Sequence, residues 1–477
     1  MFGPAFGQRV ALEEQSMTLA PNSLQARDIA YTVHPYTNLR QHERQGPLVI
    51  TGGDGVYVID DDGRRYIEGL AGLWCTGLGF SEKRLAEAAR RQMEKLPFSQ
   101  SFAHRSSDPL IALAEKLIGM APAPLAKAYF VNSGSEAIDT AIKLIWYYQN
   151  ARGFPEKKKL IARQRAYHGI TIAAGHLTGS LAYTTGGFDL PMMDRFRHVT
   201  APNLYRYGLP GETEAQFVER LAKELEDLIL AEGPETIAAF FAEPVQGAGG
   251  VLVPPQGYFQ RVQEILKRHD ILFVADEVIC GFGRTGNRWG CDTFGIQPDL
   301  LTCAKQLSSA YLPIAALLMS DAFYQVLADQ SEKLGTLGMG YTYGGHPVSA
   351  AVALETLKIY EEDGTFEHVR EVEPHFLRRL KKLEAHPLVG EARGIGLIGG
   401  IEIVRNKATR EQFEPALKAN AQIVAKCQAH GLLLRPLPGD SIGICPPMII
   451  TGQEIDLLFD KLQAALDDSL GAMPLAA

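Results

Sequence analysis

The sequence has no basic excess and no long apolar run. Its 47 lysine and arginine residues are outnumbered by 55 aspartate and glutamate residues, giving a net charge of −8. A general nucleic-acid-binding protein needs a basic excess to neutralise phosphates, so the charge argues against a nucleic-acid partner. No stretch approaches the ~18 uninterrupted apolar residues of a membrane span. We therefore expect neither nucleic acid nor membrane as a partner.

Cysteine pairs and a secretion signal are also missing. The six cysteines are scattered without a C-x-x-C pair, which predicts reduced, packed thiols in a cytoplasmic protein. The start, "MFGPAFGQRVALEEQ", lacks the regions of a signal peptide, and we expect a flexible arm or a segment that packs on a partner. The histidines lack metal-ligand spacing, with His168 and His176 isolated from other candidate ligands, so no metal is expected.

The sequence does contain a long alternation of helical patterns with short apolar runs. Residues 46–73 have the pattern of short strands and turns, and the first helix of the alternation is expected from Ser81 as N-cap. Continuous apolar runs between helices predict parallel strands covered on both faces. The predicted fold class is therefore α/β, with a large domain whose mainly parallel sheet is covered by helices, plus a smaller α/β domain.

The expected domain organisation has three parts. Residues 1–75 form an N-terminal segment that belongs to the small domain, residues 76–343 form the large cofactor-binding domain, and residues 344–477 form the C-terminal small domain.

Polar residues stand at the ends of several apolar runs, where ligands of such sheets bind. Gly134 and Ser135 in "NSGSEA" fall between a strand and a helix, so helix amides and a hydroxyl could hold a phosphate. A plain helix N-cap accounts for the same residues equally well. Asp276 and Glu243 each end an apolar run, and a buried carboxylate needs a partner. That partner could be a cationic ring nitrogen, another ion or a loop to be capped.

Lys305 in "LLTCAKQLSSAYLP" interrupts a stretch that otherwise resembles a buried one. A desolvated lysine has a lowered pKa and attacks carbonyls as a neutral amine, whereas a snorkelling surface lysine needs no such chemistry. Together, a phosphate cradle, a strand-end acid and a strand-end lysine suggest pyridoxal 5'-phosphate. The lysine would hold the aldehyde as a Schiff base, and Asp276 would keep the pyridine nitrogen protonated.

A second motif, "GFGRTG" at residues 281–286, matches the G-x-G-x-x-G pattern of dinucleotide sites. Such a site also needs a helix that opens within the motif. The following "NRWGCDTFGIQP" is broken by glycine and proline, so we do not expect a dinucleotide site.

At this point the chain resembles the class III aminotransferases, which are fold-type I pyridoxal-phosphate enzymes. The resemblance covers residues 35–465 and rests on "NSGSEA", "AYHG", "AEPVQG", "ADEVICGFGRTG", "AKQLSSAYLP", "YTYGGHP" and "CPP", in family order. Within the family, "GLWC", "LPFSQSF", "RYG" and "RPLPGDSIGICPP" resemble the omega-transaminases, or amine–pyruvate transaminases, which use pyruvate as acceptor.

The resemblance implies catalytic roles for Lys305 and Asp276. The cofactor-binding residues it implies are Ser133, Gly134, Ser135, Tyr167, His168, Glu243, Asp276, Val278, Lys305 and Thr342. Tyr167 would stack on the cofactor ring and Val278 would pack on its other face. Glu243 would belong to the hydrogen-bonding shell around Asp276 and the ring hydroxyl. Thr342 would reach the phosphate of the neighbouring subunit's cofactor.

The substrate-binding residues implied by the resemblance are Trp74, Phe102, Tyr167 and Arg435. Phe102 would come from the other subunit. Arg435 would be a mobile arginine that grips the acceptor's carboxylate. Alternatively, Trp74 and Phe102 are core aromatics and Arg435 forms a surface salt bridge. Gln306 departs from the family, in which a small residue commonly follows the lysine, and this could alter local packing.

The implied activity is a ping-pong transfer of an amino group from a primary amine or omega-amino acid to a keto acid, with pyruvate as the expected acceptor. A homodimer with shared sites is also implied. Alternatives within the cofactor class are a beta-alanine or diamine transaminase, an aminomutase and a decarboxylating enzyme. A nicotinamide-dependent dehydrogenase using "GFGRTG" and a catalytically inactive binding protein are the alternatives outside that class.

Overall fold

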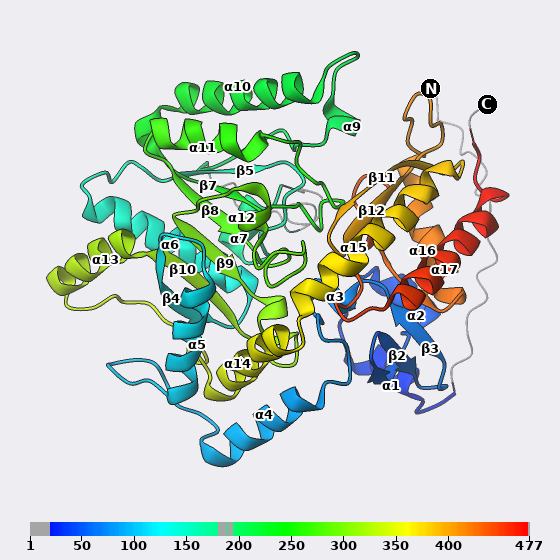
Figure 1. Cartoon of the computed structure of the whole chain (residues 1–477), viewed down its shortest axis with the longest axis horizontal. Helices are drawn as coiled ribbons and strands as arrows, with labels where there is room; N and C mark the ends of the chain where they lie inside the picture. The colour runs from blue at the N-terminus through cyan, green and yellow to red at the C-terminus, as the bar shows by residue number, and fades with distance from the viewer. Residues whose placement is uncertain (1–19, 180–187, 189–193, 476–477) are drawn as a thin grey trace, which may run out of the picture. The chain divides into compact units, whose positions relative to one another are not determined.

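The computed structural model describes residues 20–179, 188 and 194–475. The expected N-terminal arm therefore lies outside the described residues. The chain divides into two compact units, and the described residues of the first are drawn in blue in Figure 1. We call residues 1–52 with 58–65 the N-terminal unit, and residues 53–57 with 66–477 the main unit.

The N-terminal unit contains two short helices, α1 (Leu24–Tyr31) and α2 (Leu39–Gln45), and most of the strands β1 (Ile50–Asp54) and β2 (Tyr57–Asp60). Side-chain oxygens of Ser23 and Asn38 cap the two helices by accepting hydrogen bonds from the first turn. Neither helix contains a buried residue. Packing of apolar side chains within this unit therefore contributes little to holding the helices.

A seven-stranded sheet in the order β4-β10-β9-β8-β7-β5-β6 forms the centre of the main unit. Every neighbouring pair is parallel except those that β10 makes with β4 and β9. The strands are β4 (Leu125–Val131), β5 (Lys159–Arg163), β6 (Phe196–Val199), β7 (Ile237–Ala242), β8 (Leu272–Asp276), β9 (Leu300–Cys303) and β10 (Ala315–Ser320). The predicted mainly parallel sheet is confirmed.

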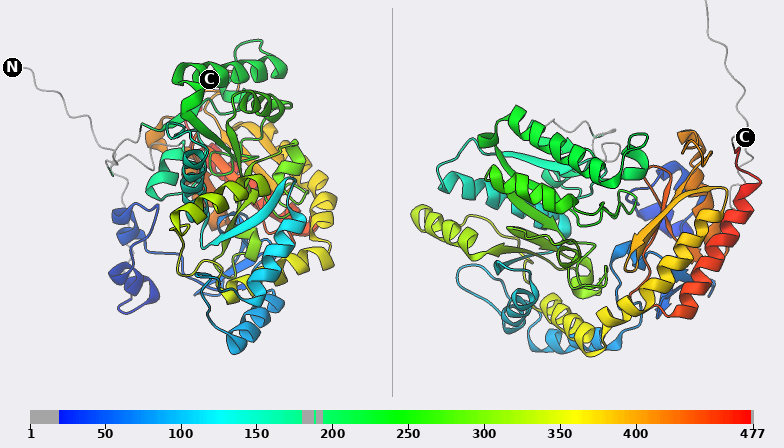
Figure 2. Two further views of the ribbon diagram at one scale, coloured as in Figure 1. Left: turned by 90° about the vertical axis from the view of Figure 1, so that its left-hand side faces the viewer. Right: turned by 45° about the horizontal axis from the view of Figure 1, so that its top comes forward.

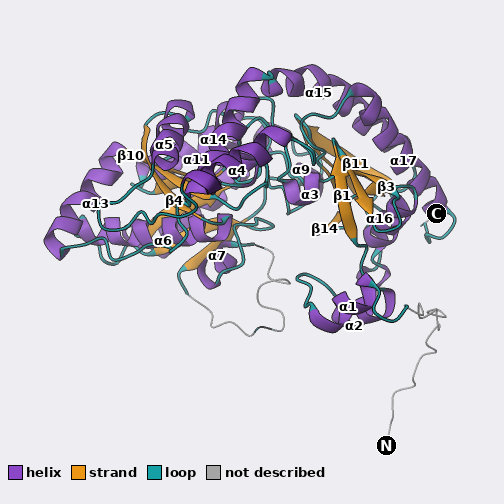
Figure 3. Ribbon diagram, turned by 90° about the horizontal axis from the view of Figure 1, so that it is seen from below, coloured by secondary structure: helices purple, strands orange, loops and turns teal. Residues whose placement is uncertain are grey.

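Successive residues of these strands pack on opposite faces of the sheet. Phe240 and Phe273 belong to one apolar cluster, whereas their neighbours Phe241 and Val274 belong to another. Figure 3 shows α5 and α11 on one side of the strands and α6 and α7 on the other. Because both faces are covered, the strands are the continuous apolar runs seen in the sequence.

The helices around this sheet differ widely in length. They are α4 (Lys83–Lys95), α5 (Asp108–Met120), α6 (Gly134–Ala151), α7 (Ile172–Leu177), α9 (Leu204–Tyr207), α10 (Glu214–Glu232), α11 (Tyr258–Arg268), α12 (Gly290–Phe294), α13 (Asp321–Leu334) and α14 (Pro347–Glu362). The expectation that Ser81 caps the first of them is wrong. Glu82 is the N-cap of α4, and the Ser81 hydroxyl instead accepts a hydrogen bond from the Gly55 N–H at 2.9 Å.

The C-terminal part of the main unit has its own four-stranded antiparallel sheet, ordered β11-β12-β15-β14. Its strands are β11 (Val389–Ile395), β12 (Ile398–Ile403), β14 (Arg435–Leu437) and β15 (Ser441–Ile444). The helices α15 (Thr365–Lys382), α16 (Ala419–Ala429) and α17 (Gly452–Leu470) complete it, and Figure 2 shows α15 and α17 in yellow and red beside these strands.

A parallel pair of short strands, β3 (Arg65–Glu68) and β13 (Leu432–Leu433), joins an early segment to this C-terminal part. The helical turn α3 (Ala71–Trp74) follows β3 directly. The three-part domain division remains a prediction. None of the helices in the described ranges is both long and apolar enough to cross a membrane.

Candidate active site

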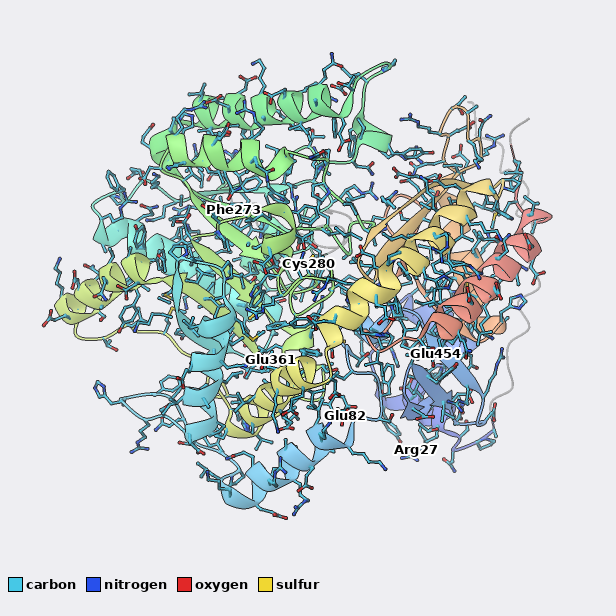
Figure 4. The ribbon with its side chains drawn as sticks, viewed as in Figure 1. Arg27, Glu82, Phe273, Cys280, Glu361 and Glu454 are labelled. Carbon is cyan, nitrogen blue, oxygen red and sulfur yellow. The ribbon has the colours of Figure 1, made fainter. Side chains whose placement is uncertain are left out.

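Most of the predicted site residues follow the carboxyl ends of parallel strands, at one edge of the large sheet. Ser133, Gly134 and Ser135 follow β4, Tyr167 and His168 follow β5, Glu243 follows β7, Asp276 ends β8 with Val278 after it, and Lys305 follows β9. Phe273 and Cys280, labelled in Figure 4, mark the course of β8 and of the loop that leaves it. The sheet topology thus brings these separate motifs to a common edge.

The start of α6 has the features of an anion site. The hydroxyl of Ser133 caps the helix, so the N-cap interpretation is correct, yet the N–H groups of Gly134 and Ser135 donate no hydrogen bond to any described residue. The Ser135 hydroxyl accepts from the Ile170 N–H at 3.1 Å. A Cβ atom on Gly134 would lie 3.3 Å from both methyl groups of Val278. Glycine therefore lets the helix start approach Val278 closely, with two amides left to bind an anion.

Asp276 is buried and firmly oriented. Its Oδ2 lies 2.8 Å from His168 Nδ1, and its Oδ1 accepts from the Val278 N–H at 3.1 Å and from the Thr302 hydroxyl at 3.3 Å. Because an ionised carboxylate only accepts hydrogen bonds, Nδ1 of His168 carries a proton in this pair. His168 Nε2 is buried and has no hydrogen-bond partner among the described residues.

Glu243 lies near this pair, but backbone groups hold both of its oxygens. Oε1 accepts from the Tyr167 N–H and Oε2 from the Gly247 N–H, each at 3.0 Å. Burial raises the pKa of Glu243, an effect that the nearby His168 opposes and Asp276 reinforces. Glu243 thus fixes the backbone on which Tyr167 stands. Its predicted contact with the cofactor's ring hydroxyl stays a prediction.

Lys305 starts a short 3-10 helix directly after β9 and its φ is +52°. A residue with a Cβ atom costs about 1–2 kcal/mol in this left-handed region, so the surrounding structure must impose the conformation. Burial lowers the pKa of the Lys305 ammonium, and this effect is partly offset by Cys75, Asp276 and Glu243. Nζ has no hydrogen-bond partner among the described residues. A lowered pKa increases the share of neutral, nucleophilic amine.

These groups fit pyridoxal phosphate. The two unused amides of α6 suit its phosphate, the unpaired amine of Lys305 suits its aldehyde, and the oriented carboxylate of Asp276 suits a protonated ring nitrogen. The half-buried side chains of Tyr167 and Val278 follow the same strand ends, as stacking partners of a flat ring would. The individual roles of these residues remain predictions.

The predicted substrate residues fall into two places. Trp74 is only 2% exposed, and a Cβ on Gly443 would lie 2.8 Å from its ring. Gly443 in β15 is paired with Arg435 in β14. Arg435 is therefore the direct neighbour of the glycine that packs on Trp74. Phe102 is 40% exposed and packs over Gly340. Thr342, which was predicted to bind the cofactor's phosphate, is exposed and lies two residues after Gly340.

Two further buried residues lie near the site. Gln306 is fully buried, its Nε2 donates to the Ile279 carbonyl at 3.4 Å, and its Oε1 has no partner in the described chain. Glu277, which the sequence motifs did not single out, accepts from the N–H groups of Gly290 and Cys291 at 3.0 and 2.5 Å. Burial raises the pKa of Glu277 to about 7. The sequence signal that could have identified Glu277 is its place as the second acid of "ADEV", directly after a buried strand.

The "GFGRTG" motif forms a buried turn rather than a dinucleotide site. Helix α12 begins only at Gly290, after the motif has ended. Arg284 inside the motif is fully buried and donates to the carbonyls of Leu397 and Pro446, at 3.2 and 2.6 Å. The motif therefore contacts the C-terminal part through Arg284. The sequence prediction that no helix opens within the motif is confirmed.

Comparison with known proteins agrees with this site. The family described as "Aminotransferase class-III" matches residues 39–466. The chain is 51% identical, over 91% of its length and 84% of the relative's, to a mitochondrial gamma aminobutyrate transaminase 1 of Solanum lycopersicum.

Two solved structures are also similar. The omega transaminase of Pseudomonas jessenii, in complex with PMP, is 50% identical with a TM-score of 0.93, covering 95% of this chain and 99% of that one. A transaminase with L-alanine is 54% identical with a TM-score of 0.87, covering 89% and 100%. This chain therefore belongs to the class III aminotransferases, enzymes that transfer amino groups with the cofactor pyridoxal 5'-phosphate.

Proposed function

We propose that the enzyme is an omega-transaminase that takes the amino group of a primary amine or omega-amino acid and gives it to pyruvate. The observation that carries this proposal is the adjacency of Arg435 and Trp74 through Gly443. One substrate site can then offer a guanidinium to a carboxylate and an aromatic wall to an apolar group. The names of similar proteins support both substrates, since gamma-aminobutyrate is an omega-amino acid and L-alanine is the product of amino transfer to pyruvate.

In this proposal the cofactor supplies an electron sink when it is bound. The chain's own residues do the remaining work. Lys305 presents a neutral amine that removes the proton from the substrate carbon. The resulting ammonium then donates that proton back to complete the amino transfer. Asp276, held by His168 and the Val278 N–H, keeps a negative charge fixed beside the ring nitrogen. The α6 amides anchor the phosphate end, so Lys305 works at a fixed position.

Substrate choice is tested by half-reactions with single amines. The wild-type enzyme and the variant Arg435→Met would be mixed with gamma-aminobutyrate, L-alanine or 1-phenylethylamine, and the cofactor's absorbance change followed. A bidentate guanidinium–carboxylate contact contributes about 1.5–3 kcal/mol, so the variant should lose about 10- to 150-fold in kcat/KM for the two carboxylates. The carboxylate-free amine should change by less than about threefold. Equal losses for all three amines would contradict a role of Arg435 in carboxylate binding.

We further propose that two chains form a homodimer with shared sites. Large side chains near the predicted site are exposed in the single chain, namely Leu73 at 55%, Phe102 at 40% and Tyr343 at 63%, and a second copy would cover them. Co-expression of Lys305→Ala with Thr342→Arg chains tests this arrangement. If Thr342 serves the partner's site, the mixed dimer contains one intact site and recovers activity that neither parent has. If each chain builds its own site, the mixture stays inactive.

A further inference from the structure

The N-terminal unit holds a cluster of three side chains that residue spacing did not reveal. Asp28 belongs to α1, His42 belongs to α2, and His34 lies in the segment between these helices. Their ligand atoms all lie within 4.8 Å of one another. Asp28 Oδ2 lies 2.7 Å from His34 Nε2 and 3.1 Å from His42 Nε2. We call these residues the Asp–His–His cluster.

Both imidazoles present the same nitrogen to the same point. Their ring centroids are 4.2 Å apart, and each ring directs Nε2 to Asp28 Oδ2. The Nδ1 atoms of His34 and His42 have no hydrogen-bond partner among the described residues. Without a cation each Nε2 donates its proton to Asp28 Oδ2. Because no described residue occupies Nδ1, each neutral ring can move that proton to Nδ1 when a cation takes the lone pair of Nε2.

Two imidazole nitrogens and one carboxylate oxygen are a donor set that suits zinc and its neighbours, whereas Mg²⁺ and Ca²⁺ favour oxygen. We propose that Asp28, His34 and His42 bind one divalent transition-metal ion of the zinc class, with water in the remaining coordination position. Metal–ligand distances of about 2.0–2.1 Å in a tetrahedron place ligand atoms about 3.3–3.4 Å apart. The present contacts of 2.7 and 3.1 Å need only a small outward movement to reach that spacing.

A bound ion would stabilise the helices of the N-terminal unit. Helices α1 and α2 have only 8 and 7 residues, and neither buries a side chain. Helices this short are marginal alone, and small units that lack a core are commonly held by a metal. An ion bound by Asp28 and His42 would cross-link the two helices, and His34 would fix the segment between them. The side chains are 10–30% exposed, so an ion can reach them from solvent.

Zinc binding to the tag-free holoenzyme tests the proposal. After treatment with a chelator and dialysis, the protein would be equilibrated with Zn²⁺, Mg²⁺ or Ca²⁺ alone, and bound metal per chain measured. We expect one Zn²⁺ per chain and neither of the other ions. His34→Asn with His42→Asn should weaken zinc binding at least about 100-fold, with turnover unchanged. The matched control is His430→Asn, which removes a histidine whose Nε2 lies 2.7 Å from Asp468 without a third ligand among the described residues, and it should bind zinc as the wild type does.

Hydrogen exchange locates the ion. Zinc should slow exchange of amides in residues 24–45 of the wild type and leave them unchanged in the double variant. Asp28→Asn provides a second test if the double variant unfolds, because it keeps both imidazoles and should bind zinc at least about tenfold more weakly than the wild type. Absence of zinc binding, equal binding by the double variant, or binding without slower exchange at residues 24–45 would each overturn the proposal.

Discussion

Arg165 is expected to position Arg435 for the acceptor. Arg165 stands two residues before Tyr167 on the loop after β5, and its guanidinium donates to the Pro438 carbonyl at 2.8 Å. Pro438 lies in the turn that leaves β14, the strand that begins with Arg435. The same guanidinium reaches into space left by Gly439, where a Cβ atom would lie 2.8 Å from it. One side chain therefore ties the Arg435 segment to the loop that carries Tyr167.

The variant Arg165→Met keeps much of the apolar stem and removes this tie. A hydrogen bond from a charged donor contributes about 1.5–3 kcal/mol. If half of that energy holds the Arg435 segment in its binding position, kcat/KM for pyruvate should fall about 4- to 12-fold. Most of the loss should appear in KM, because the reacting groups at Lys305 are not touched. The same enzyme acting on 1-phenylethylamine in a half-reaction should change by less than about twofold.

Gly439→Ala gives an independent perturbation of the same contact. Its φ is +71°, and the added Cβ would press on the Arg165 guanidinium, so the substitution strains the turn from the other side. Steady-state kinetics with pyruvate and 2-oxobutyrate, combined with the amine half-reaction, would separate the two substrates. If both variants slowed the amine half-reaction as much as the keto-acid reaction, Arg165 would be a general structural residue and the reasoning would be refuted.

Three further outcomes follow from residues at or near the site. Lys305→Ala should abolish turnover and the absorbance of the lysine-bound cofactor while leaving the circular dichroism spectrum unchanged; normal turnover would remove Lys305 from its role. Glu277 has a folded-state pKa of about 7 against a usual 4.5, so its contribution to stability is complete below about pH 4.5 and falls by about 3 kcal/mol as pH rises through 7. Urea unfolding of Glu277→Gln should lack that fall, and parallel pH curves for the two proteins would contradict it. Gln306→Met removes a buried oxygen without a partner among the described residues, so the melting temperature should stay within a few degrees and kcat within about twofold.

The large sheet could be predicted because burial on both faces leaves a strong trace in sequence. Runs such as "AAFFAE" and "ILFVAD" are apolar throughout, and they form the neighbouring central strands β7 and β8. The acids that end them were visible for the same reason, since a carboxylate at the end of a buried strand needs a partner. The sequence could not show which partner. Asp276 is paired with His168, and Glu243 with backbone N–H groups from two separate loops.

Contacts made through glycine and through backbone atoms are much harder to predict from the sequence. Gly443 pairs with Arg435 and packs on Trp74, but glycines also occur in short strands at bulges and bends that have no connection with a substrate site. The Asp–His–His cluster was missed for a related reason. His34 and Asp28 lie on either side of the end of α1, so only the turn of the chain brings them together with His42.

Backbone strain is a further feature of the site that its residue types do not predict. Lys305, Trp74 and Arg165 have φ values of +52°, +64° and +63°, in a region that residues with a Cβ atom rarely adopt. Each costs about 1–2 kcal/mol, and such strain persists only where the surrounding structure imposes it. The conformation at Lys305 directs the chain away from β9 at the point where a desolvated amine is required. Burial also lowers the pKa of the lysine, so an imposed backbone conformation and a desolvated amine coincide at one residue.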